Sequence, residues 1–208
     1  MPDRLPHARL YGIVDLGYLT PRQLSTAATA LIRGGIDILQ LRAKGHPPQA
    51  VEAWGAQLLA LTRPAGIPLI INDFPDVAAH LGADGVHVGQ DDDAVARARH
   101  TLGPGKIVGK STHSLAQAAA AVTEGADYIG FGPLFATPTK PGRPAIGLHD
   151  IAEAHRLVPL PIFCIGGIKP DNLSSVLDAG ARRVVIVSAL LQAPDPEAAT
   201  RTVKDRLP

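Results

Sequence analysis

Short apolar runs alternate strictly with longer segments of helical pattern along this chain, and the unit repeats eight times. Runs of about six residues rich in Val and Ile predict buried strands. Strict alternation of strands and helices predicts a parallel sheet with right-handed crossovers. The predicted strands are Arg9–Val14, Ile36–Leu41, Pro68–Asp73, Asp84–Gly89, Lys106–Ser111, Asp127–Gly132, Pro161–Gly166 and Arg183–Ser188.

Eight such units favour closure into an α/β barrel of the (β/α)8 or TIM type, for which 208 residues is near the short end. An open doubly wound sheet is the alternative, but it usually has fewer units and a glycine-rich loop after its first strand, where this chain reads VDLGYL. No linker interrupts residues 1–208, so we expect a single domain. The predicted helices are Thr20–Gly34, Pro48–Leu61, Pro75–Leu81, Asp93–Leu102, Leu115–Glu124, His149–Leu157, Pro170–Ala179 and Pro196–Arg206.

Composition narrows the class of protein. Hydrophobic residues make up 46% of the chain, enough for a sizeable core, and a formal net charge of +1 argues against a nucleic-acid-binding protein. The lone cysteine, Cys164, lies in the middle of a predicted strand, which indicates a buried structural role in a reducing compartment. No signal sequence or long apolar run is present, so we expect a cytoplasmic protein with no membrane partner. Whether the chain forms a homo-oligomer stays open.

Polar residues gather where the predicted strands end. In barrels of this type the chemistry lies at the carboxyl ends of the strands. The opposite ends carry mostly Gly, Pro, Ile and Ala-Asp turns, so the sequence predicts an active site on one rim. The rim residues are Asp15, Gln40, Arg42, Lys44, Asn72, Asp73, the segment Gln90–Asp93, Lys110, Ser111, Lys140, Gly166, Gly167 and Ser188.

One cluster on this rim is built from charge. Gln40, Arg42 and Lys44 are spaced by two residues, so in an extended chain they point the same way, toward a multi-oxygen anion. Asp73 and Asp92 follow the next two strands, and two carboxylates suit Mg²⁺, which takes further oxygens from phosphates. The cluster predicts a pyrophosphate site; a surface salt-bridge cluster is the alternative.

A second cluster is built from backbone. The segments Ile165–Ile168 and Val187–Leu190 follow the seventh and eighth strands. Glycines let the chain approach an anion closely, and the loops after these two strands often bind phosphate in this fold. The alternative is that they form tight turns and nothing more.

The segment Phe131–Gly147 is too long for a plain connection. It carries Thr137, Thr139 and Lys140 between Gly and Pro residues, which predicts a loop that covers substrate and brings a cation to a leaving group. A surface insertion is the alternative. His87, near a strand end, fits either a substrate contact or a core histidine, and no spacing typical of zinc ligands or of a serine nucleophile is present.

Together these segments resemble the thiamine phosphate synthases along nearly the whole chain. The resemblance implies an Mg²⁺-dependent transferase that joins hydroxymethylpyrimidine pyrophosphate to a thiazole phosphate and releases pyrophosphate. Whether the thiazole phosphate carries a further carboxylate stays open. The matching segments are Gln40–Lys44, Ile71–Asp73, Ala83–Asp92, Ser111–Ser114, Gly125–Lys140, Ile165–Ile168 with Asn172, and Val184–Leu190.

The resemblance also assigns four sets of residues. Asp73 and Asp92 would bind Mg²⁺, and Arg42, Lys44, Ser111 and Lys140 would act in catalysis, in which pyrophosphate leaves first and the thiazole nitrogen captures a pyrimidine-methyl cation. The pyrimidine pyrophosphate would contact Gln40, Leu41, Arg42, Ala43, Lys44, Asn72, Ser111 and Lys140. The thiazole phosphate would contact Thr137, Pro138, Thr139, Gly167, Val187 and Ser188.

Three positions depart from the family pattern. Ala43 stands where Glu is usual, Phe74 where Arg is frequent, and Lys110 is an unusual basic residue that would suit a carboxylate on the thiazole. Related thiazole tautomerases use a histidine in the loop after the sixth strand, where this chain has Pro133. Because of the departures at positions 43, 74 and 110, a tautomerase and a non-catalytic phosphate-binding homologue stay open as alternatives. Pro133 and the two carboxylates Asp73 and Asp92 favour the synthase.

Overall fold

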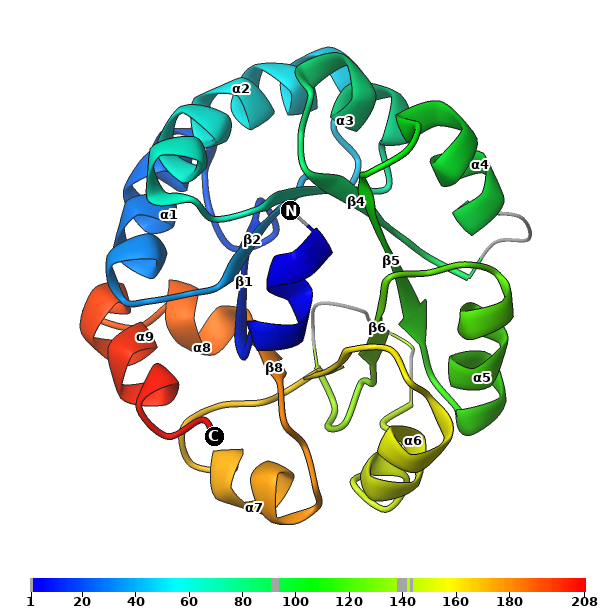
Figure 1. The fold of residues 1–208 in the computed structure, drawn as a ribbon. Coiled ribbons are helices and arrows are strands. Elements are labelled where there is room, and N and C mark those ends of the chain that lie inside the picture. The colour runs from blue at the N-terminus through cyan, green and yellow to red at the C-terminus, as the bar shows by residue number, and fades with distance from the viewer. Residues whose placement is uncertain (1, 91–93, 138–141, 143) are drawn as a thin grey trace.

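The computed structural model describes residues 2–90, 94–137, 142 and 144–208. Eight parallel strands form a closed barrel in sequence order, because β1 pairs with both β2 and β8 (Figure 1). The predicted (β/α)8 fold is confirmed. The strands are β1 Leu10–Asp15, β2 Ile38–Arg42, β3 Leu69–Asn72, β4 Gly85–Val88, β5 Ile107–Thr112, β6 Tyr128–Phe131, β7 Ile162–Ile165 and β8 Val184–Ile186.

The helices form a ring outside the barrel, and the eight predicted helices all correspond to helices of this ring (Figure 1). Two short elements were not among the predicted ones: the 3-10 helix η1 Pro2–His7 before β1, and α8 after β8. The helices are η2 Pro21–Gln23, α1 Leu24–Arg33, α2 Pro48–Ala65, α3 Pro75–Leu81, α4 Ala94–Leu102, α5 Leu115–Thr123, α6 Ile151–Leu157, α7 Leu173–Asp178, α8 Ser188–Leu191 and α9 Pro196–Lys204.

Buried apolar side chains fall into two layers. Successive side chains of a strand point to opposite faces, so in β1 Tyr11 and Ile13 enter the barrel while Leu10 and Val14 pack against the helices. Cys164 lies in the outer layer and is fully buried, as predicted, and burial raises the pKa of its thiol to about 12. In the described part of the chain, no helix is long and apolar enough to cross a membrane.

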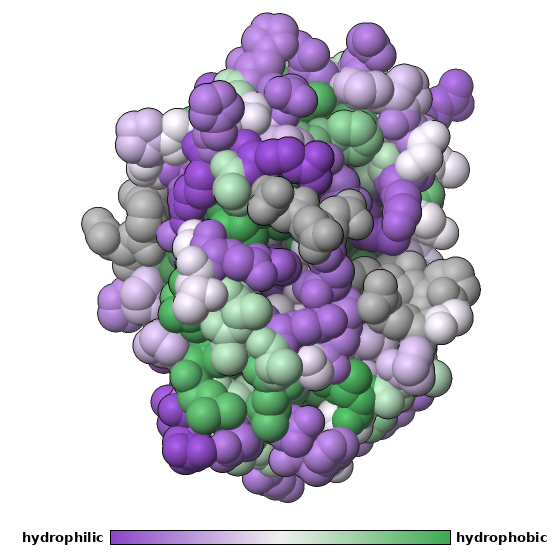
Figure 2. Space-filling model, turned by 90° about the vertical axis from the view of Figure 1, so that its right-hand side faces the viewer, coloured by the Kyte–Doolittle hydropathy of each residue, from purple (hydrophilic) through white to green (hydrophobic). Residues whose placement is uncertain are grey.

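The outer face of the helix ring is mixed in polarity. Figure 2 shows the side that lies on the right in Figure 1, with mostly hydrophilic side chains above and apolar ones gathered lower down. The exposed residues of α5 are Ala116, Ala119, Ala120 and Thr123, and Leu157 at the end of α6 is 45% exposed.

The amino-terminal mouth of the barrel is closed by η1, which lies across it in Figure 1. Leu5 is 4% exposed and joins the inner core, and Ala8, just after η1, joins it too. Arg9 and Arg183 both donate to the Pro6 carbonyl oxygen, at 2.9 and 2.8 Å, and so fix η1 in place. A small molecule can therefore enter the barrel at the carboxyl ends of the strands.

Candidate active site

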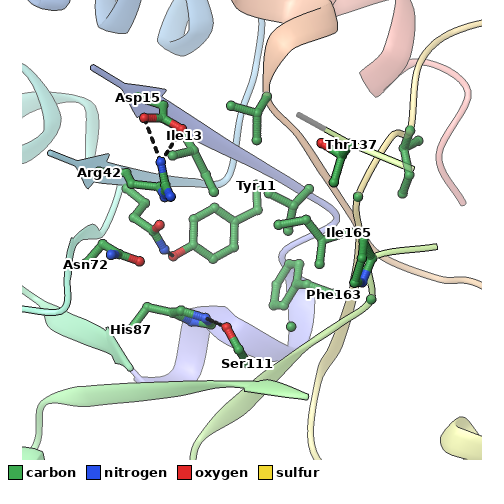
Figure 3. Close-up of a pocket in the computed structure, with 18 of the residues that line it drawn as sticks. Tyr11, Ile13, Asp15, Arg42, Asn72, His87, Ser111, Thr137, Phe163 and Ile165 are labelled. Carbon is green, nitrogen blue, oxygen red and sulfur yellow. Dashed lines mark hydrogen bonds and ion pairs between the residues drawn. The ribbon is translucent and has the colours of Figure 1, made fainter. Parts of the chain in front are cut away.

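A pocket opens at the carboxyl ends of the strands, with about 890 Å³ of empty volume that is partly open to solvent (Figure 3). Its base is aromatic, made by Tyr11, Tyr128 and Phe163, and side chains from the ends of several strands form its walls. The polar side chains that line it are Asp15, Gln40, Arg42, Asn72, His87, Ser111, His113, Thr137 and Ser188.

A chain of hydrogen bonds crosses the base of the pocket. Gln40 Nε2 donates to Tyr11 Oη at 2.8 Å, and the hydroxyls of Tyr11 and Tyr128 lie 2.9 Å apart. His87 then bridges Tyr128 Oη and Ser111 Oγ through its two ring nitrogens, each at 3.0 Å. Burial raises the pKa of both phenols well above the ordinary value, so they are neutral. This chain of hydrogen bonds fixes the directions of the Gln40, His87 and Ser111 side chains at the base of the pocket.

The aromatic rings pack edge to face. Phe163 lies 5.4 Å from Tyr11 and 5.5 Å from Tyr128 between ring centroids, at interplanar angles of 89° and 83°. Gly109 on β5 makes room for them, because a Cβ there would lie 2.1 Å from Tyr128 Cζ. The base is thus a rigid aromatic surface, a shape that suits a planar ring.

The charged wall of the pocket is an ion pair between β1 and β2. Arg42 Nη1 donates to both carboxylate oxygens of Asp15, at 3.0 and 2.8 Å (Figure 3). Asp15 is 1% exposed, whereas the Arg42 side chain is 13% exposed and faces the pocket. A cation is therefore presented at the rim in a fixed direction.

The opposite wall contains the glycine turn that follows β7, beside the apolar side chains of Ile165, Ile168 and Val187. Gly166 and Gly167 follow β7 with φ of +100° and +66°, and a Cβ at Gly167 would lie 2.7 Å from Phe135 Cβ. Asn172 holds this turn, since its Nδ2 donates to the Gly167 carbonyl at 2.9 Å. Thr137 and Ser188 line both the main pocket and a shallower hollow beside it. Such a surface offers amides and hydroxyls to an anion.

The structure brings most of the described site residues together. Leu41 and Ala43 do not reach the pocket, because their side chains are buried in the outer core. The predicted residues that line the pocket are Gln40, Arg42, Asn72, Ser111, Thr137, Gly167, Val187 and Ser188. Asp92, Pro138, Thr139 and Lys140 lie outside the described residues.

Lys44 does not continue the line of Gln40 and Arg42. Strand β2 ends at Arg42, and the chain turns at Lys44 and Gly45, where φ is +81°. Alternation of side chains holds only within a strand, so Lys44 is exposed and is not among the residues that line the pocket.

Asp73 stands on the rim just after β3. It is exposed and has a φ of 63°, which is uncommon for a residue with a side chain. Its Oδ2 accepts a hydrogen bond from Asn72 Nδ2 at 2.7 Å, and its backbone N–H donates to the His87 carbonyl. Within the described ranges, no group of three or more metal-ligating side chains occurs.

Lys110 is not on the pocket side of β5. It is 7% exposed, its ammonium is ion-paired with Glu124 just after α5, and it does not line the pocket. The prediction that Lys110 could meet a substrate carboxylate is therefore wrong, because neighbouring side chains of a strand face opposite sides and Ser111 takes the inner one.

The sequence reasoning missed the base of the pocket. Tyr11, Tyr128 and Phe163 lie within predicted apolar strands and are not among the predicted site residues, and neither is His113, whose Nδ1 contacts the Gly132 carbonyl. The signal was present in β1, because Tyr11 lies on the same strand face as Asp15, four residues further on.

Comparison with known proteins identifies the family of this chain. Residues 10–190 match the family described as thiamine monophosphate synthase. A thiamine-phosphate synthase of Thermus thermophilus is 49% identical over 202 residues, 96% of this chain and 97% of the relative. One from Roseiflexus castenholzii is 48% identical over 207 residues, 98% and 91% of the two chains. The solved thiamine phosphate pyrophosphorylase of Pyrococcus furiosus matches with a TM-score of 0.86 and 31% identity, over 98% of this chain and 96% of that one. The resemblance seen in the motifs is confirmed, and the chain belongs to the thiamine monophosphate synthase family.

Proposed function

We propose that this protein joins hydroxymethylpyrimidine pyrophosphate to a thiazole phosphate, forms thiamine phosphate and releases pyrophosphate. Family membership supports thiamine-phosphate synthase, a transferase, as the activity. The observation that carries the finer proposal is the pocket itself, where an aromatic base lies between a cationic wall and a glycine-rich backbone wall. The two walls differ in chemistry, and each could bind one phosphate group, while the aromatic base between them could pack against a planar ring. This arrangement suits two phosphorylated heterocycles.

The pyrimidine ring would lie against the aromatic base. Gln40, Asn72 and Ser111 line this part of the pocket and offer amide and hydroxyl groups to ring nitrogens and an exocyclic amine. The pyrophosphate would extend toward Arg42, with Lys44 and Lys140 as further cations. Lys44 would need its exposed turn to close over the bound substrate.

Mg²⁺ would be held by Asp73 and Asp92 together with the pyrophosphate. The Asp73 carboxylate fits this role, because it is exposed on the rim and, among the described residues, accepts a side-chain hydrogen bond from the neighbouring Asn72 amide. Asp92 belongs to the segment after β4, and β4 pairs with β3, the strand that leads to Asp73. A bound Mg²⁺ would supply positive charge to the departing pyrophosphate.

The residues of the chain favour departure of pyrophosphate before the new bond forms. Arg42 stabilises the charge that grows on the leaving group. The aromatic faces of Tyr11, Tyr128 and Phe163 can stabilise the pyrimidine-methyl cation, and such contacts contribute about 0.5–2 kcal/mol. The thiazole nitrogen then attacks with its lone pair and needs no general base. Its phosphate would bind at Thr137–Thr139, Gly167, Val187 and Ser188.

The thiazole substrate is proposed without a carboxylate contact from Lys110, since that ammonium is paired with Glu124. Pro133, in place of a histidine after β6, argues against a tautomerase. A tautomerase would convert a thiazole carboxylate phosphate without Mg²⁺ or pyrimidine substrate, so the assay below separates the two activities.

The test is a direct assay of the purified protein. With both substrates and Mg²⁺ it should release one pyrophosphate for each thiamine phosphate formed. Asp73→Ala should lower kcat/KM by about 100-fold, because the metal position is lost. Asp76→Ala, a neighbouring exposed carboxylate on α3, is the matched control and should keep full activity. No pyrophosphate release at high enzyme concentration would reject the synthase, and full activity of Asp73→Ala would reject the metal assignment.

A further inference from the structure

We propose that Asp15 is a positioning residue of the reaction, which acts by fixing the direction in which Arg42 presents its guanidinium to the substrate pyrophosphate. The inference rests on the proposed function, since it assigns Arg42 to the leaving group. Asp15 itself is not among the residues that the family resemblance assigns to substrate, metal or catalysis.

The contacts of Asp15 are directed at a single nitrogen of Arg42. Nη1 lies 3.0 Å from Oδ1 and 2.8 Å from Oδ2, and strands β1 and β2 place the two residues opposite each other in register. A guanidinium is planar and carries five N–H donors in a fixed fork. Holding one nitrogen on a carboxylate therefore sets the direction of the whole group.

Asp15 is itself held by the turn that follows β1. Its Oδ1 accepts from the Gly17 backbone N–H at 2.9 Å, and its carbonyl oxygen accepts from the N–H groups of Tyr18 and Leu19 at 2.9 and 3.1 Å. The residue is 1% exposed, so water does not compete for the carboxylate. Arg42 thus has a rigid, charged and dehydrated support.

Burial of this pair makes a role in stability alone a poor explanation. Taking two charges out of water costs free energy that their attraction recovers only in part, and apolar replacements of buried pairs are often as stable. Here the pair lines the pocket at the end where the leaving group is proposed to lie (Figure 3). A role in orienting Arg42 explains why a carboxylate is present at position 15, whereas a role in packing alone does not.

Asp15→Asn should separate rate from binding. The asparagine keeps one acceptor oxygen but loses the charge that holds Arg42, so kcat should fall by about 10- to 100-fold, the usual cost of misplacing a catalytic group. The affinity for inorganic pyrophosphate should not fall, because a negative charge near the anion has been removed. A residue that only stabilised the fold would lower the melting temperature and leave kcat per folded molecule unchanged.

The closing experiment is a double-mutant cycle of Asp15→Asn and Arg42→Gln, measured as kcat with saturating substrates and Mg²⁺, with pyrophosphate affinity from calorimetry. Asp15→Asn should lower kcat with Arg42 in place and have no further effect, within about twofold, in the Arg42→Gln background. Asp37→Asn is the matched control: that carboxylate pairs with Lys204 near the amino-terminal end of β1, and its loss should leave kcat unchanged.

The outcomes separate this inference from the proposed function. No turnover by the unmodified protein overturns the function and the inference with it. Turnover with wild-type kcat in Asp15→Asn, or an equal loss in both Arg42 backgrounds, overturns the inference alone. If Asp15→Asn does not fold, Arg42→Lys replaces it: lysine keeps the charge but lacks the planar fork, so kcat should fall at least 10-fold, and an unchanged kcat overturns the inference.

Discussion

At the scale of single residues, His155 on α6 shows how burial without a partner changes a titratable group. Its Nε2 is buried and has no hydrogen-bond partner among the described residues. Burial lowers its pKa to about 4, and the nearby charges of Arg182 and Arg183 add to this effect. Burial shifts the pKa of Cys164 in the opposite direction. The charged form of a thiol is the anion, and burial disfavours the charged form, so the pKa of Cys164 is raised.

His155 should make the protein less stable in mild acid. Its pKa is lower in the folded protein than the ordinary 6.5, so between pH 6.5 and about 4 the unfolded chain binds more protons. The free energy of unfolding therefore has its highest value, as far as His155 determines it, above pH 6.5. It decreases as the pH drops from 6.5 to about 4. Partial exposure of His155 reduces the effect to about 1 kcal/mol.

Urea denaturation at pH 7.5 and pH 5 measures this loss. His155→Gln should lose less stability than the wild type between the two pH values, whereas His100→Gln, an exposed histidine on α4, should follow the wild type. Equal pH dependence in all three proteins would contradict the assignment.

At the scale of elements, the packing of β5 beside β6 inside the barrel depends on the absence of a side chain at position 109. Gly109 on β5 faces Tyr128 on β6, with the two residues paired in register. The Tyr128 ring fills the space that a side chain at position 109 would need, and the same ring carries the hydroxyl between Tyr11 and His87. Barrel packing and pocket chemistry thus depend on one glycine.

Gly109→Ala should damage both stability and activity. The added methyl group would overlap a fully buried ring, which costs about 1–3 kcal/mol, and the displaced Tyr128 would break the hydrogen-bond chain. Gly89→Ala is the control for stability, because a Cβ there meets no atom of the described residues within 4 Å. Thermal unfolding and kcat/KM measure the two effects, and a Gly109→Ala protein with wild-type values of both would contradict this account.

At the scale of the whole molecule, the two mouths of the barrel differ. The amino-terminal mouth is closed by η1, with Leu5 in the inner core and the Pro6 carbonyl held by Arg9 and Arg183. The carboxyl-terminal mouth is open and lined by polar groups. Ligands that bind there stabilise the folded barrel as a unit, because the pocket takes residues from many strands.

Pyrophosphate should stabilise the protein mainly when Mg²⁺ is present. At 100 times its Kd a ligand adds about 2.7 kcal/mol, which for a chain of this size raises the Tm by roughly 5–10 °C. Removal of the metal with EDTA should abolish most of this rise, as measured by thermal unfolding. Arg42→Gln should reduce it, whereas Arg201→Gln, which breaks a surface pair with Glu197, should not. An equal rise with and without Mg²⁺ would reject the metal as part of the site.

The sequence by itself determined the architecture and half of the site. Strand and helix periods are local properties, so eight alternating units were enough to predict the closed barrel and the rim that carries Arg42, Ser111 and Gly167. The tertiary structure decided which neighbours those residues meet. Strand β2 ends at Arg42, and Lys44 turns outward. Lys110, on the outer side of β5, pairs with Glu124 at the end of α5. Inside the barrel, hydrogen bonds join Tyr11, Tyr128 and His87. These contacts join segments 14 to 117 residues apart, and their partners are fixed by barrel closure and packing, which a local pattern does not encode.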